Sequence, residues 1–428
     1  MKLSILHQYK NNLILNRFAK VFSVDVLVKA SGFILLPVYL KLMTQQEYGL
    51  YSYLISIIST FSVFLNFGLY IAQSKLYQDL EQKEKGKLLF TIHVTLFLAL
   101  FPLLLVMYGF KLDYVLLNFL FKNPINYPLY RFPILVAVVT SVYSFMLSNY
   151  FLTSERIRYI QRFNFFRLIL VNGVVLLILF FFKGDAVGIR LKYNYLIELG
   201  ITGVFFYFYI KAMSRSFDRQ LAFKSLKLGL PIMASALCDI VINFGDKFFL
   251  EKFVGFKELS IYYLAFSGAS VIPFFFSTLQ NVWLPIFLKE KNLSENLRKT
   301  KKMIKQVSIL LLLLCIGILV FVKVVLWINL IDNQKYSAVL RLLPIMLLSQ
   351  AVSALTHLLI NYVVYFEQTY FTSLISVCFG CISLVCNLLF IRTYGMYGAA
   401  FSLLGINMLQ FGVYYILLKW NVRKRLVV

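Results

Sequence analysis

The sequence predicts an all-α integral membrane protein with about twelve transmembrane helices, in two related six-helix bundles around a central cavity. Of its 428 residues, 60% are apolar and only 14% are charged, whereas soluble domains are about 45–50% apolar and ~25% charged. Apolar runs near the ~20 residues that cross a bilayer recur along the chain. They lie at roughly 18–40, 49–74, 88–109, 132–152, 164–182, 193–210, 228–250, 260–285, 307–329, 339–363, 370–390 and 397–418.

A repeated offset relates the two halves of the chain. Three pairs of matching residues are 211 positions apart and occupy equivalent places in the predicted spans. The pairs are Pro133 and Pro344, Gly184 and Gly395, and Tyr51 and Tyr262. Chance matching among common residues is the alternative, but a duplicated six-helix unit gives a constant offset of this kind. We therefore expect an N-terminal bundle over 1–212 and a C-terminal bundle over 213–428.

The net charge of +25 comes largely from basic residues between the apolar runs. Clusters of lysine and arginine follow the eighth predicted span and end the chain, which places both segments in the cytoplasm by the positive-inside rule. An even number of spans then puts both termini there. The first residues show no cleavable signal sequence, so the first span is expected to stay in the protein. This composition excludes a soluble enzyme and a nucleic-acid-binding domain.

Charged residues within the spans are candidate site residues. A charge at the bilayer centre costs about 2.5–3.5 kcal/mol and usually faces the bundle interior or a wet path. Span 1 carries Lys20, Asp25 and Lys29. Asp25 and Lys29 are four residues apart and share a helical face. They predict either a cationic lumenal site tuned by an acid or a neutral structural pair, and the sequence leaves both open.

Span 7 carries a longer polar stripe. Asp239, Asn243 and Asp246 follow one another at steps of four and three, and Lys247 comes directly after them. Such steps keep one helical face. A lumenal role is favoured for Asp239, because no basic residue lies one turn away on its helix. Asp246 and Lys247 either join the site or end the span at the membrane surface.

Polar stripes on further spans indicate a wet central cavity. Their members include Asn66 and Gln73 in span 2, Glu198 and Thr202 in span 6, and His357 in span 10. For His357 a packing role is favoured over a pH-dependent one. Arg167 in span 5 stands apart, because its planar guanidinium suits two phosphate oxygens at once. The alternative is that Arg167 extends to the cytoplasmic surface.

Signatures of catalysis are missing from the sequence. We find no phosphate-binding glycine loop, no metalloprotease histidine pair and no nucleophile elbow. Cys378 and Cys381 lie within an apolar helix without a histidine or acid, so packing is favoured over a metal site. We expect no catalytic residues, no metal and no cofactor, and we predict that the protein is not an enzyme.

Several motifs resemble those of a known transporter family. The sequence Glu47-Tyr48-Gly49-Leu50-Tyr51-Ser52 resembles a pattern of polysaccharide-exporting flippases, the O-antigen (Wzx-type) transporters. Further family-like segments are Leu36-Pro37-Val38-Tyr39-Leu40, Asn66-Phe67-Gly68-Leu69-Tyr70, Gly229-Leu230-Pro231, Gly245-Asp246-Lys247-Phe248-Phe249-Leu250 and Tyr394-Gly395-Met396-Tyr397-Gly398. The matches follow the family order over nearly the whole chain. Lys247 stands where the family usually has arginine, which puts bidentate binding there in doubt.

The resemblance implies the multidrug/oligosaccharidyl-lipid/polysaccharide (MOP) exporter superfamily. The implied function is to flip an undecaprenyl-diphosphate-linked oligosaccharide from the cytoplasmic to the periplasmic leaflet of the bacterial inner membrane. Alternating access would drive this, with a proton or sodium gradient as a candidate energy source. A drug/cation antiporter of the same superfamily is the alternative, and a membrane polymerase or ligase of the same glycans is less favoured. A polysaccharide polymerase is a candidate partner, besides the membrane lipids.

The hypothesis assigns a role to each candidate residue. The diphosphate would meet the cations Lys20, Lys29, Arg167 and Lys247. The sugars would meet the polar side chains Asn66, Gln73, Asn243 and His357. A coupling ion would bind at Asp25, Asp239 or Asp246.

Overall fold

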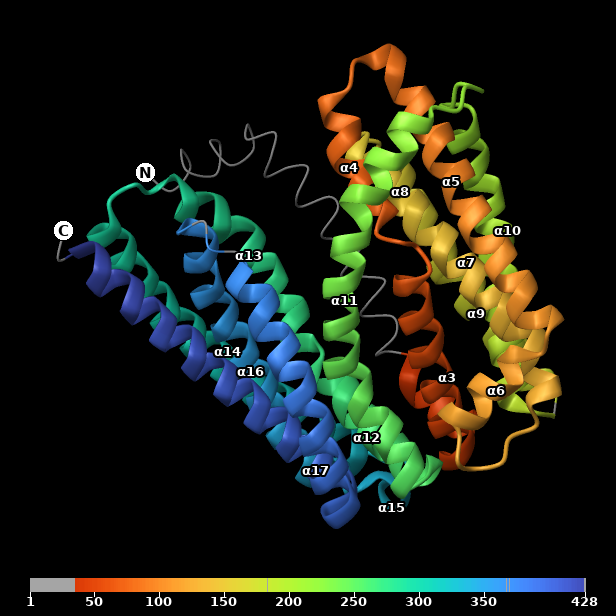
Figure 1. The fold of residues 1–428 in the computed structure, drawn as a ribbon. Coiled ribbons are helices and arrows are strands. Elements are labelled where there is room, and N and C mark those ends of the chain that lie inside the picture. Colours follow the sequence, from red (N-terminus) through yellow and green to blue (C-terminus); the bar gives the residue numbers. More distant parts are fainter. Residues whose placement is uncertain (1–34, 183, 367, 369, 427–428) are drawn as a thin grey trace, which may run out of the picture. The chain divides into compact units, whose positions relative to one another are not determined.

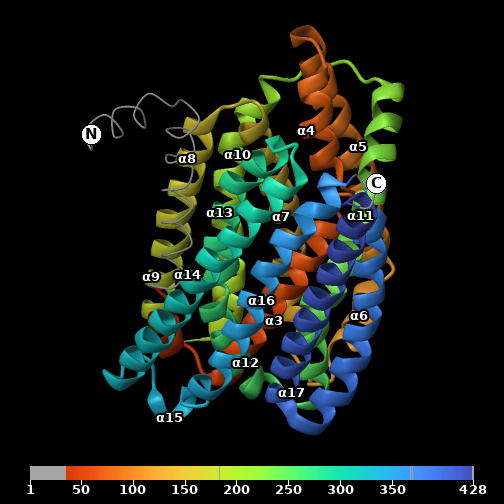
Figure 2. The same ribbon diagram turned by 90° about the vertical axis from the view of Figure 1, so that its left-hand side faces the viewer.

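The computed structural model describes residues 35–182, 184–366, 368 and 370–426 (Figures 1 and 2). Within these residues every regular element is a helix, which confirms the predicted all-α class. Seven helices there are long and apolar enough to cross a membrane, or eight if the bent pair α3 (Gln45–Phe64) and α4 (Leu69–Asp79) forms one span. The chain is therefore a multi-pass membrane protein, and the number twelve stays a prediction.

The chain folds into two compact units. The described part of the first consists of 35–47 and Leu54–Leu237, and the second consists of Tyr48–Tyr53 and residues from Cys238 onward. Two helices contribute to both units, namely α3 and α11 (Arg219–Phe253). The predicted bundle limits at 212 and 213 stay a prediction, because α11 is shared.

The first unit is built around α7 (Tyr127–Thr153) and α10 (Ala186–Ile210), which pack along each other (Figures 1 and 2). α4 packs on α7, and a further span packs on α10. That span, Ile157–Phe181, is formed by three successive elements. The remaining bounds are α5 (Gln82–Gly109), α6 (Leu112–Leu120), α8 (Ile157–Phe166), the π-helix η1 (Arg167–Val171) and α9 (Asn172–Phe181).

The second unit is built around α16 (Val339–Tyr365), which contacts the helices α12 (Phe256–Ala269), α13 (Val271–Lys289), α14 (Leu293–Trp327) and α17 (Tyr370–Leu426). A short helix, α15 (Asn333–Tyr336), precedes it. Gly395 has a φ of 57° and interrupts α17, between the predicted spans 370–390 and 397–418.

Equivalent helices support the predicted relation between the two bundles. The first residues of α3 and α12 are 211 positions apart, as are those of α5 and α14. Those of α7 and α16 are 212 apart, and each of these helices has 27 residues with an internal proline, Pro133 or Pro344. A shared helix register over three pairs is what duplication of one unit produces.

The start of α3 explains part of the Glu47-Tyr48-Gly49 motif. The Thr44 hydroxyl accepts from the Glu47 amide at 3.2 Å, and the Glu47 carboxylate accepts from the Thr44 amide at 2.7 Å. This reciprocal pair is a capping box. A side chain at Gly49 would meet the Phe256 carbonyl oxygen at 1.9 Å. The glycine therefore permits a close backbone approach inside the second unit.

Packing separates apolar interior residues from apolar surface residues. Tyr150, Phe163 and Tyr209 lie in the core of the first unit. Large apolar side chains such as Phe181 and Leu312 are exposed. An exposed apolar surface is stable where lipid, rather than water, surrounds the helices.

Candidate functional site

An ion pair joins two elements of the first unit. The Arg167 Nη2 atom lies 2.8 Å from Glu198 Oε1. The two side chains differ in exposure, which is 36% for Arg167 and 6% for Glu198. Arg167 begins η1, and Glu198 lies in the middle of α10.

Hydroxyl groups complete the surroundings of Glu198. The Ser144 hydroxyl on α7 donates to Glu198 Oε1 at 3.1 Å and lies 2.8 Å from the Thr202 hydroxyl. Thr202 lies one turn after Glu198 on α10, so both face α7. The sequence identified this stripe but gave Glu198 no role, because Ser144 and Arg167 come from other spans.

The π-helix positions Arg167 where an unbroken α-helix would not. π-helices are rare, are usually one turn long and are frequent at functional sites. The Asn172 side chain, just after η1, donates to the Leu168 carbonyl at 2.9 Å and accepts from the Tyr39 hydroxyl at 3.4 Å. These side-chain bonds support the irregular backbone beside Arg167.

The depth of Arg167 limits what its exposed part can contact. It lies ten residues into the helical span Ile157–Phe181, but the first ten residues of that span form α8, which is amphipathic and carries Arg158 and Arg162. Arg167 therefore lies in the first turn of the apolar run predicted at 164–182. A guanidinium that enters the hydrocarbon core is stable only against water, protein polar groups or an anion.

A break in the second predicted span lies between α3 and α4, which meet at an angle of 43°. Phe67 and Gly68 have φ values of 53° and 66°, in the left-handed region that favours glycine. A side chain at Gly68 would meet the Gly229 carbonyl oxygen at 2.2 Å, and one at Gly229 would meet the Phe67 carbonyl oxygen at 2.5 Å. The backbones of α11 and the break therefore touch at these two glycines.

Asn66 lies in this break and is completely buried. Its Oδ1 and Nδ2 atoms make no hydrogen bond. Gln73, also buried, accepts from the Tyr209 hydroxyl at 3.3 Å, while its Nε2 atom has no partner. Buried amides of this kind are uncommon and call for an explanation, such as a water or ligand that they bind. Both were predicted to face sugars, and this stays a prediction.

The second unit contains a different kind of ion pair. Lys247 Nζ lies 3.0 Å from Asp246 Oδ1, and the two side chains are only 5% and 3% exposed. The Tyr262 hydroxyl donates to Asp246, and the Phe266 ring lies 4.2 Å from Lys247 Nζ. Protein groups thus enclose the pair from several sides. The geometry favours the structural interpretation of these two residues, and their site roles stay predictions.

The remaining predicted residues differ in how far they can be placed. His357 on α16 is exposed, and its ring lies 6.1 Å from that of Phe276. Lys20, Asp25 and Lys29 lie outside the described residues, as do the side chains of Asp239 and Asn243. Sequence reasoning also missed Glu251, which is buried on α11 directly after the predicted end of span 7.

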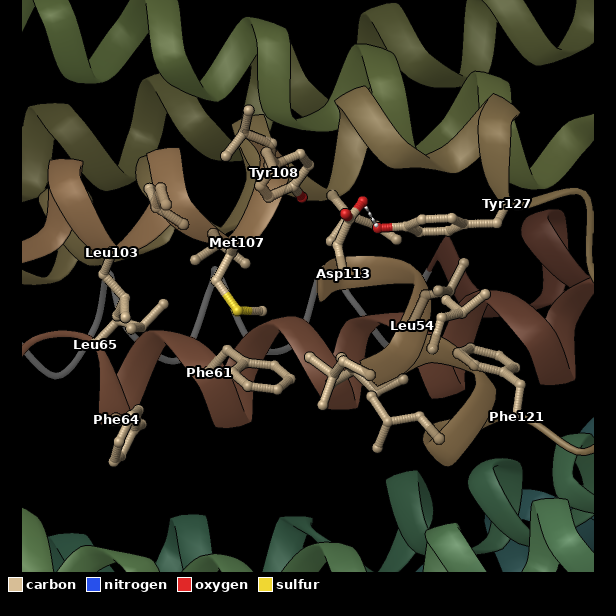
Figure 3. A pocket seen from close by; sticks show the side chains of 18 residues that line it. Leu54, Phe61, Phe64, Leu65, Leu103, Met107, Tyr108, Asp113, Phe121 and Tyr127 are labelled. Carbon is tan, nitrogen blue, oxygen red and sulfur yellow. Dashed lines mark hydrogen bonds between the residues drawn. The ribbon is translucent and has the colours of Figure 1, made fainter. Parts of the chain in front are cut away.

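An apolar cavity of about 210 Å³ lies in the first unit between α3, α5, α6 and α7. Figure 3 shows Phe61 and Leu65 of α3 facing Leu103 and Met107 of α5 across it. One end is polar, where the Tyr127 hydroxyl donates to Asp113 at 2.8 Å (Figure 3).

Arg131 pairs with Asp113 at the polar end of this cavity. Its guanidinium donates to both oxygens of Asp113, at 2.6 and 3.2 Å, and to the Tyr108 carbonyl at 2.7 Å. The helix α6, which the sequence analysis treated as loop, begins beside Asp113 and is tied to α7 by this network. In this ion pair too the arginine is the more accessible partner, since Arg131 is 28% exposed and Asp113 is 4% exposed.

Metal chemistry finds no support among the described residues, where no group of three histidine, cysteine or acidic side chains could hold an ion.

The polysaccharide biosynthesis protein family matches residues 15–291, well over half of the chain. The chain belongs to this family. No curated protein matches the sequence. The family match confirms the resemblance that the motifs predict.

Solved structures agree on the fold. The chain is similar to the lipid II flippase MurJ in an inward closed conformation, with a TM-score of 0.73, 14% identity and coverage of 93% of this chain and 87% of that one. It is also similar to an inward-facing multidrug resistance MATE transporter of the MOP superfamily, with a TM-score of 0.67, 14% identity and 94% coverage of each chain. A third match is a MOP superfamily transporter from Pyrococcus furiosus, with a TM-score of 0.60, 12% identity and coverage of 95% and 94%. This member of the family therefore has the MOP transporter fold.

Proposed function

We propose that this protein flips a lipid-diphosphate-linked oligosaccharide across the bacterial cytoplasmic membrane, with both termini in the cytoplasm. One observation carries the proposal beyond the family match: Arg167 presents a partly exposed guanidinium within a helical segment that is long and apolar enough to cross the membrane. An anion that crosses the bilayer needs such a group on its path. The undecaprenyl carrier and the identity of the sugars are the parts that the resemblance alone suggests.

Arg167 is the proposed contact to the diphosphate. Its planar fork matches two phosphate oxygens at once. In the absence of substrate, Glu198 neutralises it at 2.8 Å. Because Glu198 is buried and Arg167 is half-exposed, the guanidinium can turn to an incoming anion while the carboxylate stays in place.

The other predicted residues complete the path. Lys20 and Lys29 would attract the diphosphate near the cytoplasmic side. Asn66 and Gln73 have buried amide atoms without partners, which suits them to sugar hydroxyls. Lys247 is the weakest of the four cations as a diphosphate contact, because Asp246 and Phe266 enclose it. We propose no covalent chemistry, since moving the lipid between leaflets breaks no bond.

The superfamily neighbours that are multidrug transporters suggest a second function, the export of cationic drugs. Arg167 argues against it, because its guanidinium is the more accessible partner of the pair with Glu198, so a ligand that enters meets the positive group first.

Sidedness of the precursor tests the proposal. A host without this gene should accumulate the lipid-linked oligosaccharide on the cytoplasmic leaflet and lose surface polysaccharide. The wild-type gene should restore export, and Arg167→Gln should restore about a tenth or less, because a charge-assisted hydrogen bond is worth about 1.5–3 kcal/mol. Arg298→Gln is the matched control, since Arg298 is 80% exposed and pairs with Glu295 outside the site. Unchanged precursor with raised sensitivity to cationic drugs would contradict the proposal.

A further inference from the structure

The segment that joins α14 to α16 in the second unit forms an open polar hollow. The hollow has a volume of about 490 Å³ and is lined by Leu326, Trp327, Asn329, Asp332, Asn333 and Gln334. This volume falls within the range of about 300–1,000 Å³ that is typical of small-molecule sites. Four of the six lining residues carry an amide or a carboxylate. The lining therefore suits a polar ligand better than a hydrocarbon chain.

Trp327 forms one edge of this hollow and is 82% exposed. It is the last residue of α14, and a tight turn follows it. The Asn329 amide donates to the Leu326 carbonyl at 3.1 Å, and the Leu330 amide donates to the Val325 carbonyl at 3.0 Å. These two bonds form a Schellman motif with Asn329 at a φ of 54°, a conformation that asparagine tolerates. The motif fixes the backbone that carries Trp327.

The short helix α15 and the residue before it form the other edge. Asp332 Oδ1 accepts from the amides of Gln334 and Lys335 at 3.0 and 3.3 Å, and its Oδ2 lies 3.0 Å from Lys335 Nζ. Asp332 thus holds this edge in place. The side chains of Asn329, Asn333 and Gln334 are exposed. The hollow therefore presents an indole ring together with three accessible amides.

An indole beside amides fits a sugar. A pyranose ring has faces of C–H groups, which pack on an aromatic ring, and a rim of hydroxyls that donate and accept hydrogen bonds. The indole is large, rigid and apolar, and each amide can donate to one hydroxyl and accept from another. None of the six lining residues is a cation, and Asp332 adds a negative charge. The hollow therefore suits a neutral sugar better than an anion.

A tryptophan at the end of a span often serves only as an anchor at the membrane surface. Trp420 fits that role, since it is 51% exposed near the end of α17 and Lys424 Nζ lies 5.5 Å from its ring. Trp327 differs, because it lines a hollow together with amides. The duplication does not account for it either, since Leu116, 211 positions earlier, lines the apolar cavity of the first unit. The hollow is therefore specific to the second unit.

The order of the spans gives the side of the membrane on which the hollow lies. The helix α16 and the two parts of α17, which Gly395 separates, come after it in the chain. With the C-terminus in the cytoplasm, as proposed, these three crossings put the hollow on the outer side. The basic cluster at 298–305 agrees, because it precedes the apolar part of α14 and belongs in the cytoplasm.

We infer that this hollow binds the sugars of the lipid-linked oligosaccharide on the outer side of the membrane, with Trp327 stacked on one sugar ring. The inference rests on the proposed function, because flipping is what brings the oligosaccharide to that side. The lipid keeps the sugars near the membrane surface. Ile328 and Leu330, next to the hollow, expose apolar side chains that suit this surface. A sugar bound here has already crossed the membrane, so the site acts after the flip.

Binding of the free oligosaccharide tests the inference. The probe is the oligosaccharide released by mild acid from the lipid fraction of the host that lacks this gene. It carries neither lipid nor diphosphate, so Arg167 adds nothing to its affinity. Calorimetry on the full-length protein in nanodiscs should show that Trp327→Ala binds at least about tenfold more weakly than the wild type. Trp327→Phe keeps an aromatic face and should stay within about threefold of the wild type. Trp420→Ala is the matched control and should bind as the wild type does.

Fluorescence locates the bound sugar. The chain has three tryptophans, so a protein with Trp283→Phe and Trp420→Phe reports on Trp327 alone. The probe should shift its emission with the affinity that calorimetry gives. A protein that keeps only Trp420 should show no shift. Trp327→Ala should unfold at the wild-type temperature, because this side chain is 82% exposed, and should export at least about threefold less polysaccharide.

The outcomes distinguish this inference from the proposed function. No binding of the probe by the wild type, wild-type affinity in Trp327→Ala, or bound probe without a shift from Trp327 would each overturn the inference. Full export by a variant that no longer binds the probe would do the same. All four leave the proposed function standing. A host that lacks the gene and yet accumulates no lipid-linked oligosaccharide on the cytoplasmic leaflet would overturn the proposed function, and the inference with it.

Discussion

The two units differ in how their buried asparagines are paired. In the second unit, every buried asparagine among the described residues donates a hydrogen bond, namely Asn296, Asn361, Asn387, Asn407 and Asn421. In the first unit, the buried Asn66 has no partner for either side-chain atom. Asn66 is thus the exception among the buried asparagines of the described residues.

The ion pairs show the same contrast. Asp246 and Lys247 are adjacent in sequence, are both nearly inaccessible and are enclosed by aromatic residues. Arg167 and Glu198 come from different helices, and one of them is open. A closed pair contributes to folding, whereas a pair with one open partner can exchange that partner for a ligand. Burial of the partners, rather than the presence of charge, is what distinguishes these two ion pairs.

Replacing the cation of the closed pair should have the largest effect on stability. Lys247→Met leaves the Asp246 carboxylate buried beside Tyr262 without its nearest positive charge, at a cost of about 3–5 kcal/mol. Thermal unfolding in mixed micelles measures this. Adding Asp246→Asn should recover much of the loss, because the amide needs no counter-charge. A Lys247→Met protein as stable as wild type would remove the contrast between the units.

The same replacement in the open pair should cost less stability and more transport. Arg167→Met should lower the free energy of unfolding by about 1–3 kcal/mol, because it removes one charge-assisted hydrogen bond while Ser144 still donates to Glu198. Export should fall at least tenfold. The double variant with Glu198→Gln should regain stability but not export. If Lys247→Met and Arg167→Met lower the free energy of unfolding by the same amount, the two ion pairs do not differ in their contribution to stability.

Leucine in place of buried asparagine compares the two units directly. Asn66→Leu removes two unpartnered polar atoms and should stabilise the protein by about 1 kcal/mol while it lowers export. Asn361→Leu breaks a reciprocal pair of amide hydrogen bonds with Gln280, the shorter of which is 2.6 Å. This change should destabilise the protein by about 1 kcal/mol. Unfolding and export assays on both variants test this. The opposite order of stabilities would show that Asn66 is held by contacts of its own.

Two surface aspartates should give the smallest effect. A hydrogen bond from Lys87 of α5 lowers the pKa of Asp218, and one from the neighbouring Lys335 lowers that of Asp332. A carboxylate whose pKa is lower in the folded protein than the ordinary 3.8 stabilises the fold at pH values above 3.8. This stabilisation is lost as the pH falls through the folded-state pKa. Asp218→Asn should therefore lower the melting temperature slightly at pH 7 and less at pH 3.

Asp332→Asn is the control for that change, since its lysine lies only three residues away and both side chains are more exposed. It should shift the melting temperature less than Asp218→Asn, because no second helix is joined. If Asp332→Asn lowered the melting temperature more than Asp218→Asn, the Lys87–Asp218 ion pair at the start of α11 would contribute no additional stability.

Much of the fold follows from composition and periodicity. The predicted spans within the described residues coincide with helices, because apolar segments in a bilayer must satisfy their backbone hydrogen bonds internally. The break at Asn66 and Gly68 was not foreseen, since its cause is the approach of Gly229 from a distant helix. The helix α6 was missed because a short apolar segment in a loop gives little periodic signal.

By itself, the sequence determined the membrane character of the protein, its two related halves and the presence of arginine and acids inside the spans. Only the tertiary structure decided which of these charges meet. Helical spacing places residues three or four apart on one face, but it carries no information on partners from other helices. Glu198 therefore stood as one member of a polar stripe until packing of α10 against α7 and η1 brought it to Ser144 and Arg167.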